Sequence, residues 1–489
     1  MEKRLKMKKI FKLFVLLVIS VAIGTGAMIL AYMLPTKRIE KNAKSAVKRY
    51  QKEEAFNNVV DSWHLSWGDH FTDSIMIGTA ICDSKENLFD RAMKNQRIEY
   101  EGYINAYDSL IYYCLGSDRT QGLVTLDEND KEMAEAYLSE EEELIDRQNF
   151  LPFAYPRYWN GYVVVLKAFL FLFDFNVLYV LNFLCQISLI LAVAYMLWKR
   201  DKKWYIIPYL LVIASLSPYT TCNSIQLSNI MYITLITMLV MLVKESKLKE
   251  STYIYLFAVN GICIAYFDLL TYPLLALGMP LVLYCVQNNA HSIIKRIIDL
   301  LKLSLVWLFS YVLMWMSKLV LATIITGQNV LKNAYEAFLY RSGSDENRMC
   351  DGVISDLSYG ESRAKIKGVI ELNYKEVLVR NFYSYFHVVV LSIFFIAIVL
   401  ELYILFKYRK GLKRENIKQI VPFVFVGIYP FVWFRLLINH SFGHYFYVSR
   451  IIAVVTFALL CMIVKLIECA KNNLCNEMVE GEIFNENDF

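Results

Sequence analysis

The sequence predicts an all-α fold, a polytopic bundle of about ten transmembrane helices with both termini in the cytoplasm. Of 489 residues, 57% are hydrophobic and only 20% are charged, and the apolar residues form long runs instead of alternating or amphipathic patterns. The basic residues lie in short clusters between these runs, which is typical of the loops that orient membrane helices. These observations argue against a water-soluble globule and, since no nucleic-acid-binding module is present, against a nucleic-acid partner.

The apolar runs give the positions of the spans, because roughly 20 apolar residues are needed to cross a hydrocarbon core about 30 Å thick. The first run, 10–34, follows a basic start but is long for a signal peptide and has no small-residue cleavage site behind it. We therefore expect a retained anchor. Nine further spans are expected at 176–197, 204–219, 227–243, 252–268, 271–287, 298–325, 386–406, 419–437 and 451–467.

The basic clusters set the direction of the spans, because short cytoplasmic loops carry most of the Lys and Arg. With the N-terminus inside, the cytoplasmic segments are Lys3 to Lys9, Lys199 to Lys203, Lys244 to Glu250, the stretch around Lys295 and Arg296, and Lys407 to Lys418. The apolar stretch Gly161 to Phe173 is not counted as a span, because an extra span there would place the next basic cluster, Lys199 to Lys203, on the outer side of the membrane. We expect it to be an interfacial or re-entrant helix.

The chain then divides into one membrane domain with two large extracytoplasmic loops. The segments are 1–34 (cytoplasmic start and first span), 35–175 (first outer loop with the interfacial helix), 176–325 (spans two to seven), 326–385 (second outer loop), 386–467 (spans eight to ten) and 468–489 (cytoplasmic tail). In the first loop, Ile39 to Val59 favours a helix, and the acidic stretch Asp127 to Glu143 favours a solvated helix and connection. Cys82 and Cys114 form either an outer disulfide or a pair of free thiols.

The first group of candidate site residues follows the helix-forming stretch of the first outer loop. Residues 61–73 contain three carboxylates, two imidazoles and two indoles. Asp69 and Asp73 are four residues apart, so on a helix they share one face and suit a general base and a second carboxylate. The alternative is helix capping, which we weigh slightly above chemistry for Asp73 and below it for Asp69.

A second group, Tyr155 to Tyr162, precedes the expected interfacial helix. Aromatic anchoring at the membrane interface explains Tyr158, Trp159 and Tyr162. Arg157 among these rings is suited to bind a phosphate through two parallel hydrogen bonds, and we weigh this role and a purely structural one about equally.

Three ionisable residues lie near the outer ends of later spans. Asp268, in the turn before Thr271 and Pro273, is either a functional carboxylate or a solvated helix cap. Lys318 lies about two turns from the outer end of its span, so its ammonium group reaches either the membrane surface or a polar cavity. Arg341 ends an expected outer helix, where solvation is the alternative to phosphate binding.

The last group, Asn439 to Arg450, lies in a short connection between the ninth and tenth spans. His440 and His444 are at i and i+4, but no HExxH pattern or loop carboxylate completes a metal site. Hydrogen bonding of Asn439 and both histidines to a phosphate or sugar is favoured over metal ligation. Arg450 at the head of a span suits an anionic lipid phosphate.

All of these residues are expected on the extracytoplasmic face. A carboxylate base close to several cations at a bilayer surface suits a reaction on a lipid-linked phosphate, because the cations stabilise the departing phosphate. We therefore expect Asp69, with Asp73 second, to be catalytic, and we expect a binding set of Arg157, Tyr158, Trp159, Asp268, Lys318, Arg341, Asn439, His440, His444 and Arg450.

The order of elements resembles the GT-C glycosyltransferases: a first span, a large outer loop with acidic residues, an interfacial helix and then further spans. The resemblance implies that Asp69 is the catalytic base and that the donor is a polyprenyl-phosphate sugar. The segments Arg157 to Tyr162 and Tyr266 to Pro273, together with Asn439 to Ser441, His444 and Arg450, also resemble uncharacterised multispanning proteins of low-GC Gram-positive bacteria associated with surface polysaccharides. The acidic residue lies about 35 residues beyond the first span, farther than is typical of GT-C enzymes.

The resulting expectation is an inverting glycosyltransferase of the bacterial cell membrane that moves a sugar to a cell-surface glycan or lipid-linked acceptor. The alternatives are a polysaccharide polymerase or ligase that uses lipid-diphosphate donors, and a transporter or flippase of lipid-linked sugars. A transporter is expected to carry ionisable or helix-breaking residues at the midplane of several spans, and the sequence has few. The expected partners are the lipid-linked donor, the acceptor and membrane lipids. No metal ligand is assigned, and the sequence leaves a divalent-metal requirement open.

Overall fold

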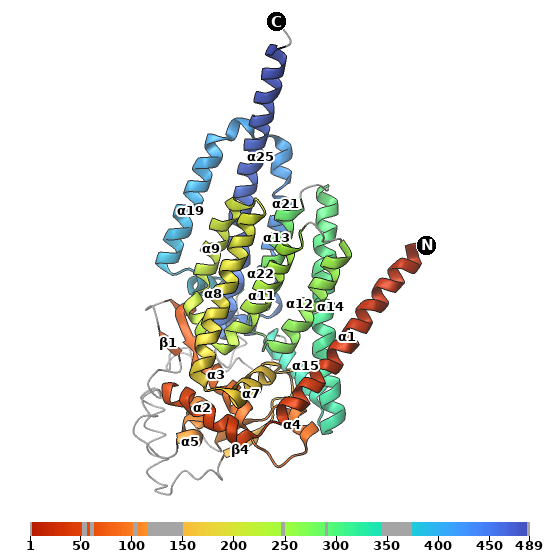
Figure 1. Cartoon of the computed structure of the whole chain (residues 1–489), viewed down its shortest axis with the longest axis vertical. Helices are drawn as coiled ribbons and strands as arrows, with labels where there is room; N and C mark the ends of the chain where they lie inside the picture. The colour runs from red at the N-terminus through yellow and green to blue at the C-terminus, as the bar shows by residue number, and fades with distance from the viewer. Residues whose placement is uncertain are drawn as a thin grey trace.

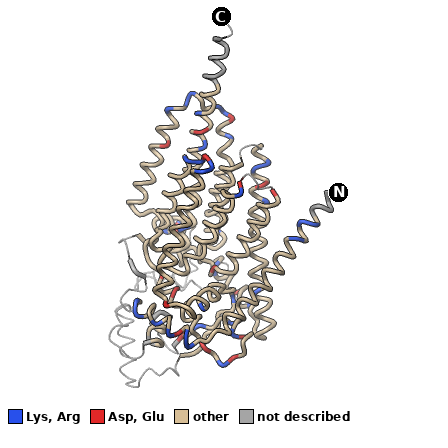
Figure 2. Tube along the Cα trace, in the orientation of Figure 1, with Lys and Arg blue, Asp and Glu red and all other residues tan. Residues whose placement is uncertain are grey.

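The computed structural model describes residues 2–50, 56–58, 63–100, 106–115, 150–245, 250–288, 292–343 and 374–486. It is a helical bundle with a layer of short helices at one end, drawn as the lower end in Figure 1. Charged residues gather toward the two ends of the bundle, and the stretches between them are mostly uncharged (Figure 2). This distribution is typical of a helical membrane protein, because a charge at the centre of a bilayer is costly.

Within the described residues, seven helical stretches are long and apolar enough to cross a membrane: Met7–Tyr32, Phe175–Lys199, Ile225–Val243, Ile293–Thr326, Val388–Lys407, Arg414–Leu436 and Tyr445–Asn476. The prediction of an all-α helical membrane protein is confirmed. Helices also occupy the three other expected positions. The main helices of the bundle are α1 (Glu2–Tyr32), α8 (Phe175–Lys199), α9 (Ile206–Ser215), α11 (Ile225–Val243), α12 (Glu250–Phe267), α13 (Leu274–Gln287), α14 (Ile293–Thr326), α19 (Val388–Lys407) and α25 (Ile452–Glu486).

One of the shorter helices, α13, lies inside the bundle. Every residue of α13 from Leu274 to Val286 is buried, and α13 packs on α11 and α25. A helix enclosed by other helices does not have to match the hydrocarbon thickness, which explains why α13 is shorter than a full span. The count of ten membrane crossings and their orientation stay predictions.

The ninth expected span, 419–437, is divided into two short helices, α21 (Val421–Gly427) and α22 (Tyr429–Leu436), and α20 (Arg414–Lys418) precedes it. Pro422 and Pro430 lie in the first turns of α21 and α22. Proline has no N–H and is tolerated in a first turn, where this donor has no partner within the helix, so each proline starts a new helix.

The lower layer is built mainly from the segment between α1 and α8. Its helices are α2 (Thr36–Tyr50), α3 (His70–Ile81), α4 (Leu88–Lys94), α5 (Ala106–Leu115) and α7 (Tyr162–Leu172), and α15 (Val330–Arg341) joins them after α14 (Figure 1). Two short antiparallel ladders complete it: β1 (Phe56–Asn58) with β2 (Trp67–Asp69), and β3 (Arg97–Tyr100) with β4 (Phe150–Phe153). A second hydrophobic core, separate from that of the main bundle, joins this layer to α1 and α14.

Several expectations for this layer can be compared with the structure. The helix expected over Ile39 to Val59 is confirmed up to Tyr50, but residues 56–58 form a strand paired with β2, so the expectation is wrong there. The acidic stretch 127–143 and residues 344–373 of the second outer loop lie outside the described residues. Cys82 and Cys114 are both buried and do not form a disulfide with each other. The stretch 161–173 forms a helix, α7, and its interfacial position stays a prediction.

The remaining short elements connect the bundle. They are η1 (His64–Ser66), η4 (Lys203–Tyr205), α10 (Pro218–Asn223), α18 (Tyr374–Tyr385), η6 (Arg409–Gly411), α23 (Ile438–Gly443), α24 (Tyr445–Val448) and η7 (Ser449–Ile451). The connection expected as a short outer loop, 439–450, is thus a succession of helical turns. These turns satisfy backbone groups locally, which allows the connection to be buried.

Candidate functional site

A group of polar side chains gathers where the lower layer meets the ends of α12, α14 and α25. Electrostatic interactions connect its members. Asp69 interacts with Arg450 and Tyr447. Arg341 interacts with His440, His444 and Tyr447, and Asp268 interacts with Tyr272. The group, called here the polar cluster, consists of Asp69, Tyr158, Asp268, Tyr272, Arg341, His440, His444, Tyr447 and Arg450. Most members are buried, whereas Arg341 and His444 are half-buried and connect the cluster to the surface.

Asp69 is the N-cap of α3. Its Oδ1 accepts a hydrogen bond from the Thr72 backbone N–H at 2.9 Å, and only 2% of the residue is exposed. Its Oδ2 is buried and has no hydrogen-bond partner in the described part of the chain. Burial raises the pKa of the Asp69 carboxyl above its ordinary value, against the opposing effects of Thr72, His70 and Arg450. The cap thus uses one oxygen and leaves the other available to a ligand.

Asp73 has a different role from the shared helix face expected of it. It is fully buried, and its two carboxylate oxygens accept hydrogen bonds from the backbone N–H groups of Ile225 and Gln226 at 3.0 and 3.1 Å and from the Ser224 hydroxyl at 3.2 Å. These N–H groups begin α11, so Asp73 caps a helix about 150 residues away instead of its own. Both of its oxygens are occupied, and we therefore do not retain Asp73 as a catalytic base.

Arg450, at the start of the last helix, holds two distant segments together. Its Nη1 donates to the Phe446 carbonyl at 2.6 Å, and its Nη2 donates to the Leu65 carbonyl at 2.8 Å, just before β2. The guanidinium also lies 5.9 Å from the centre of the Tyr272 ring. Its Nε is buried without a partner in the described residues. Arg450 therefore positions Asp69 through the chain at Leu65 and has one donor left over.

The two histidines contact each other, with ring centres 4.8 Å apart. His440 Nε2 lies 2.8 Å from the Leu270 carbonyl, and because a carbonyl only accepts, Nε2 carries the hydrogen and Nδ1 is an acceptor. That Nδ1 is buried without a partner in the described chain. Burial, with His444 and Arg341, lowers the pKa of His440 well below its ordinary value, and burial lowers the pKa of His444 to about 4. Both imidazoles are thus neutral near pH 7.

The turn before α13 presents the carbonyl that His440 binds. Asp268 accepts hydrogen bonds from the Thr271 N–H and from the Thr271 hydroxyl, the latter at 2.5 Å. Burial raises the pKa of Asp268 to about 6, against the lowering effect of these hydrogen bonds. Leu270 has a φ of 67°, a conformation that leucine rarely adopts and that is found more often at functional sites. Asp268 is therefore a turn-forming residue that orients Leu270.

Arg341 completes the cluster from α15. It donates a hydrogen bond to the Tyr158 hydroxyl, and its guanidinium lies 5.5 Å from the centre of the Tyr158 ring. Asn439 Nδ2 donates to the Tyr340 carbonyl at 2.8 Å and so attaches α23 to the end of α15. A half-buried guanidinium beside two histidines is suited to bind an anionic group that arrives from the surface.

Three of the predicted binding residues lie beside the cluster and have other partners. Lys318 is fully buried and its Nζ donates to the Met93 carbonyl at 2.8 Å, at the C-terminal end of α4. An ammonium group at that position stabilises the helix dipole. Trp159 Nε1 donates to the Met314 carbonyl at 2.7 Å. Arg157 is half-buried over the Tyr155 ring, 5.0 Å from its centre.

The interface-anchor explanation for the aromatic residues is wrong for Tyr158, Trp159 and Tyr162. All three are buried, with 4%, 0% and 3% of their surface exposed, so they do not lie at a lipid interface. The segment Tyr158 to Tyr162 packs closely against Tyr266 because residue 161 is a glycine. A Cβ there would collide with the Tyr266 ring, and its N–H donates to the Tyr266 carbonyl at 2.8 Å.

Comparison with protein-family models, curated proteins and solved structures finds no match to this chain. The polar cluster is therefore interpreted from its own geometry. It offers two buried acceptors, Asp69 Oδ2 and His440 Nδ1, together with donors from Arg450 and Arg341. In the described residues, no three His, Cys, Asp or Glu side chains lie close enough to hold a metal ion.

Sequence reasoning missed two aromatic members of the cluster. Tyr447 is buried and stacks on His444, with ring centres 5.2 Å apart, and Asp69 and Arg341 both act on it. Tyr272 is fully buried, and its hydroxyl donates to the Leu227 carbonyl. Both lie in segments whose charged residues were predicted to belong to the site. A tyrosine next to a charged residue in a membrane protein resembles an interface anchor, so the sequence gives no separate signal for either one.

Proposed function

We propose that this protein transfers a sugar from a polyprenyl-phosphate carrier to a hydroxyl group of a cell-surface glycan or lipid acceptor. The transfer takes place at the membrane face opposite the basic loops. The observation that supports this most is the buried, unpartnered Oδ2 of Asp69 in the same cluster as Arg450, His440 and Arg341. A carboxylate that is both buried and partly unpaired, with cations around it, suits proton abstraction beside a departing phosphate.

In the proposed reaction the acceptor hydroxyl attacks the anomeric carbon of the donor sugar. The new bond joins the acceptor oxygen to that carbon, the bond from the carbon to the phosphate oxygen breaks, and the hydroxyl proton goes to Asp69 Oδ2. A pKa raised by burial makes Asp69 a better base than an exposed carboxylate. Arg341 and the Arg450 Nε stabilise the phosphate as it leaves, and displacement in one step inverts the anomeric configuration.

His440 is the second acceptor and binds a different hydroxyl group of the sugar or of the acceptor molecule. Its Nε2–H is fixed by the Leu270 carbonyl, so Nδ1 has a defined direction and accepts a hydrogen bond. The neutral state of both histidines leaves the arginines as the positive charges of the cluster. This division of roles places the base on α3 and the phosphate-binding groups on α15 and at the start of α25.

The test compares Asp69→Asn with Asp174→Asn. Asparagine caps helices about as well as aspartate, so Asp69→Asn keeps the cap of α3 and removes only the base. Asp174 caps α8 by accepting from the Asn176 N–H at 2.8 Å and is the matched control. Full-length protein in vesicles is given a panel of synthetic polyprenyl-phosphate hexoses and membrane-extracted acceptors, and released polyprenyl phosphate is measured by mass spectrometry.

We expect wild type and Asp174→Asn to release polyprenyl phosphate at similar rates, and Asp69→Asn to be slower by about 10²–10⁴, the usual contribution of a general base. His440→Gln keeps a donor for the Leu270 carbonyl and should lower the rate less. If Asp69→Asn retains its rate while His440→Gln or Arg341→Met abolishes it, the carboxylate mechanism is wrong and a ligase that relies on cations is favoured. If folded wild-type protein releases polyprenyl phosphate from no donor of the panel, the proposal is refuted.

A further inference from the structure

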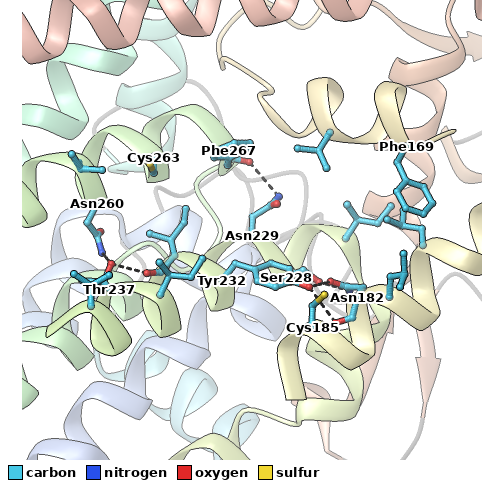
Figure 3. Close-up of a pocket in the computed structure, with 18 of the residues that line it drawn as sticks. Phe169, Asn182, Cys185, Ser228, Asn229, Tyr232, Thr237, Asn260, Cys263 and Phe267 are labelled. Carbon is cyan, nitrogen blue, oxygen red and sulfur yellow. Dashed lines mark hydrogen bonds between the residues drawn. The ribbon is translucent and has the colours of Figure 1, made fainter. Parts of the chain in front are cut away.

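A cavity of about 660 Å³ lies among α7, α8, α11 and α12, and none of its lining residues belongs to the polar cluster. Figure 3 shows side chains from these helices around it. Its walls are mainly apolar, formed by residues such as Phe169, Leu181, Ile233, Ile236, Val240 and Val259. A cavity of this composition within the membrane-crossing part of the chain suits a hydrocarbon chain better than a sugar.

The polar side chains in the cavity wall bond to the protein itself. Asn182 Nδ2 donates to the Ser228 hydroxyl, and the Tyr232 hydroxyl donates to Asn182 Oδ1 at 2.8 Å (Figure 3). Asn182 Nδ2 also donates to the Cys222 carbonyl. Asn229 Nδ2 points to the Phe267 carbonyl at 3.4 Å. Because these groups have partners, the wall is effectively apolar, and a ligand without polar atoms can occupy the cavity at little cost.

The cavity opens toward the lipid side of the bundle. Val165, Leu181, Ile236 and Val259 line it and are each between 41% and 54% exposed. Along α11 the lining runs from Ile225 to Val240, a rise of about 22 Å for 15 residues. One leaflet of a bilayer has a hydrocarbon thickness of about 15 Å. The opening, called here the lateral groove, is therefore long enough for one lipid chain lying along α11.

One end of the lateral groove lies against a basic helix. Tyr179 lines the groove, its ring holds the Arg49 guanidinium at 4.3 Å, and its hydroxyl contacts the Tyr50 hydroxyl at 3.1 Å. The same helix, α2, carries six basic residues and one acidic residue, and its apolar face is buried against the lower layer. Lys41 and Lys48 are exposed.

Further contacts attach α2 to α7, which lines the groove through Val165 and Phe169. Asn42 Nδ2 donates to the Leu170 carbonyl at 2.7 Å, and the Arg38 guanidinium lies 4.6 Å from the centre of the Phe171 ring. Outer segments of membrane proteins are ordinarily poor in Lys and Arg. A strongly basic helix beside an apolar groove is complementary to a lipid with a negatively charged headgroup.

We propose that the lateral groove binds one acyl chain of an anionic glycerophospholipid, with the lipid phosphate held by Arg49 and the exposed basic face of α2. The cations attract the headgroup, and the apolar wall shelters the chain from the surrounding bilayer. This site uses no residue of the polar cluster, so the inference does not depend on the proposed sugar transfer.

The test is photo-crosslinking of full-length protein in phosphatidylcholine vesicles. The vesicles contain a small fraction of either phosphatidylglycerol or phosphatidylcholine whose acyl chain carries a diazirine, and labelled peptides are located by mass spectrometry. Helix α19 is the reference, because it presents many exposed apolar side chains outside the groove. We expect phosphatidylglycerol to label peptides of α8, α11 and α12 more strongly than α19, and phosphatidylcholine to label all of them alike.

Two pairs of variants sharpen the result. Cys185 lines the groove and is exposed, so Cys185→Trp should fill the groove and abolish its preferential labelling, whereas Leu308→Trp, at a 46% exposed site on α14, should not. Arg49→Gln should weaken phosphatidylglycerol labelling about fivefold, the effect of one cation at an anionic surface. Lys37→Gln, about 18 Å away along α2, should weaken it less.

Equal labelling of the groove by the two lipids, or labelling that Cys185→Trp leaves unchanged, overturns the proposal. Displacement of phosphatidylglycerol by added polyprenyl phosphate at equal concentration, but not by phosphatidylcholine, also overturns it, because the groove would then belong to the donor site.

Discussion

Replacing Asp73 by alanine tests whether this carboxylate acts as a structural cap. Asp73 satisfies the first two N–H groups of α11, those of Ile225 and Gln226, and also accepts from Ser224. Alanine leaves these donors without a partner inside the protein, and each unsatisfied buried donor costs about 1–3 kcal/mol. We therefore expect Asp73→Ala to lower the free energy of unfolding by about 2–5 kcal/mol, a large fraction of the 5–15 kcal/mol typical of a folded protein.

The assay is unfolding of the full-length protein in mixed detergent micelles, followed by intrinsic fluorescence. Asp174→Ala is the matched control, because Asp174 also caps a helix but its hydrogen bond to Asn176 is solvent-exposed. Loss of an ordinary cap costs about 1 kcal/mol. If Asp73→Ala costs no more than Asp174→Ala, the argument that Asp73 links α3 to α11 is wrong.

Two other predictions concern the packing and titration of the same region. Gly161→Ala should destabilise the protein by about 1–3 kcal/mol or more, because the added Cβ collides with Tyr266. The control is Gly26→Ala, which should be neutral or stabilising because a Cβ there meets nothing within 4 Å. Equal melting temperatures of the two variants would contradict the close approach at Gly161. Burial and the neighbouring Asp69 raise the pKa of Asp73 from 3.8 to about 8, so the folded state binds the proton more tightly than the unfolded state. Wild-type protein should therefore lose stability relative to Asp73→Asn as the pH rises from about 4 to about 8, and parallel stability curves would show that Asp73 does not titrate in this way.

The bundle was predictable because the membrane imposes the same requirement on every span. A crossing helix has to be apolar along its length, and this leaves a run in the sequence whichever neighbours the helix contacts. All ten expected positions accordingly contain helices. The lower layer follows no such rule. Residues 56–58 lie in a stretch with good helix-forming composition, yet they pair with β2, because pairing with a distant segment overrides local propensity.

The grouping of several candidate site residues was predictable from the sequence, but their partners were not. Sequence reasoning placed Asp69, Arg341, His440, His444 and Arg450 on one face, and these residues do share one polar cluster. The partner of each side chain depends on contacts between segments far apart in the chain. Asp73 caps α11 about 150 residues away, and Lys318 reaches the end of α4 from 225 residues away. Residue spacing within one motif carries no information about such contacts.

The energetic cost of the polar cluster argues that it has a purpose beyond holding the fold. Asp69 Oδ2, His440 Nδ1 and Arg450 Nε are buried and have no partner in the described chain, and an unsatisfied buried group costs about 1–3 kcal/mol. Asp73 and Lys318, by contrast, form hydrogen bonds within the protein. These three atoms, which are among the buried polar atoms without a partner in the described chain, belong to one cluster, and we propose that a bound ligand pairs with them. A sugar phosphate, which carries several hydroxyl groups and a phosphate, offers hydrogen-bond donors for the two acceptors and an acceptor for the Arg450 Nε.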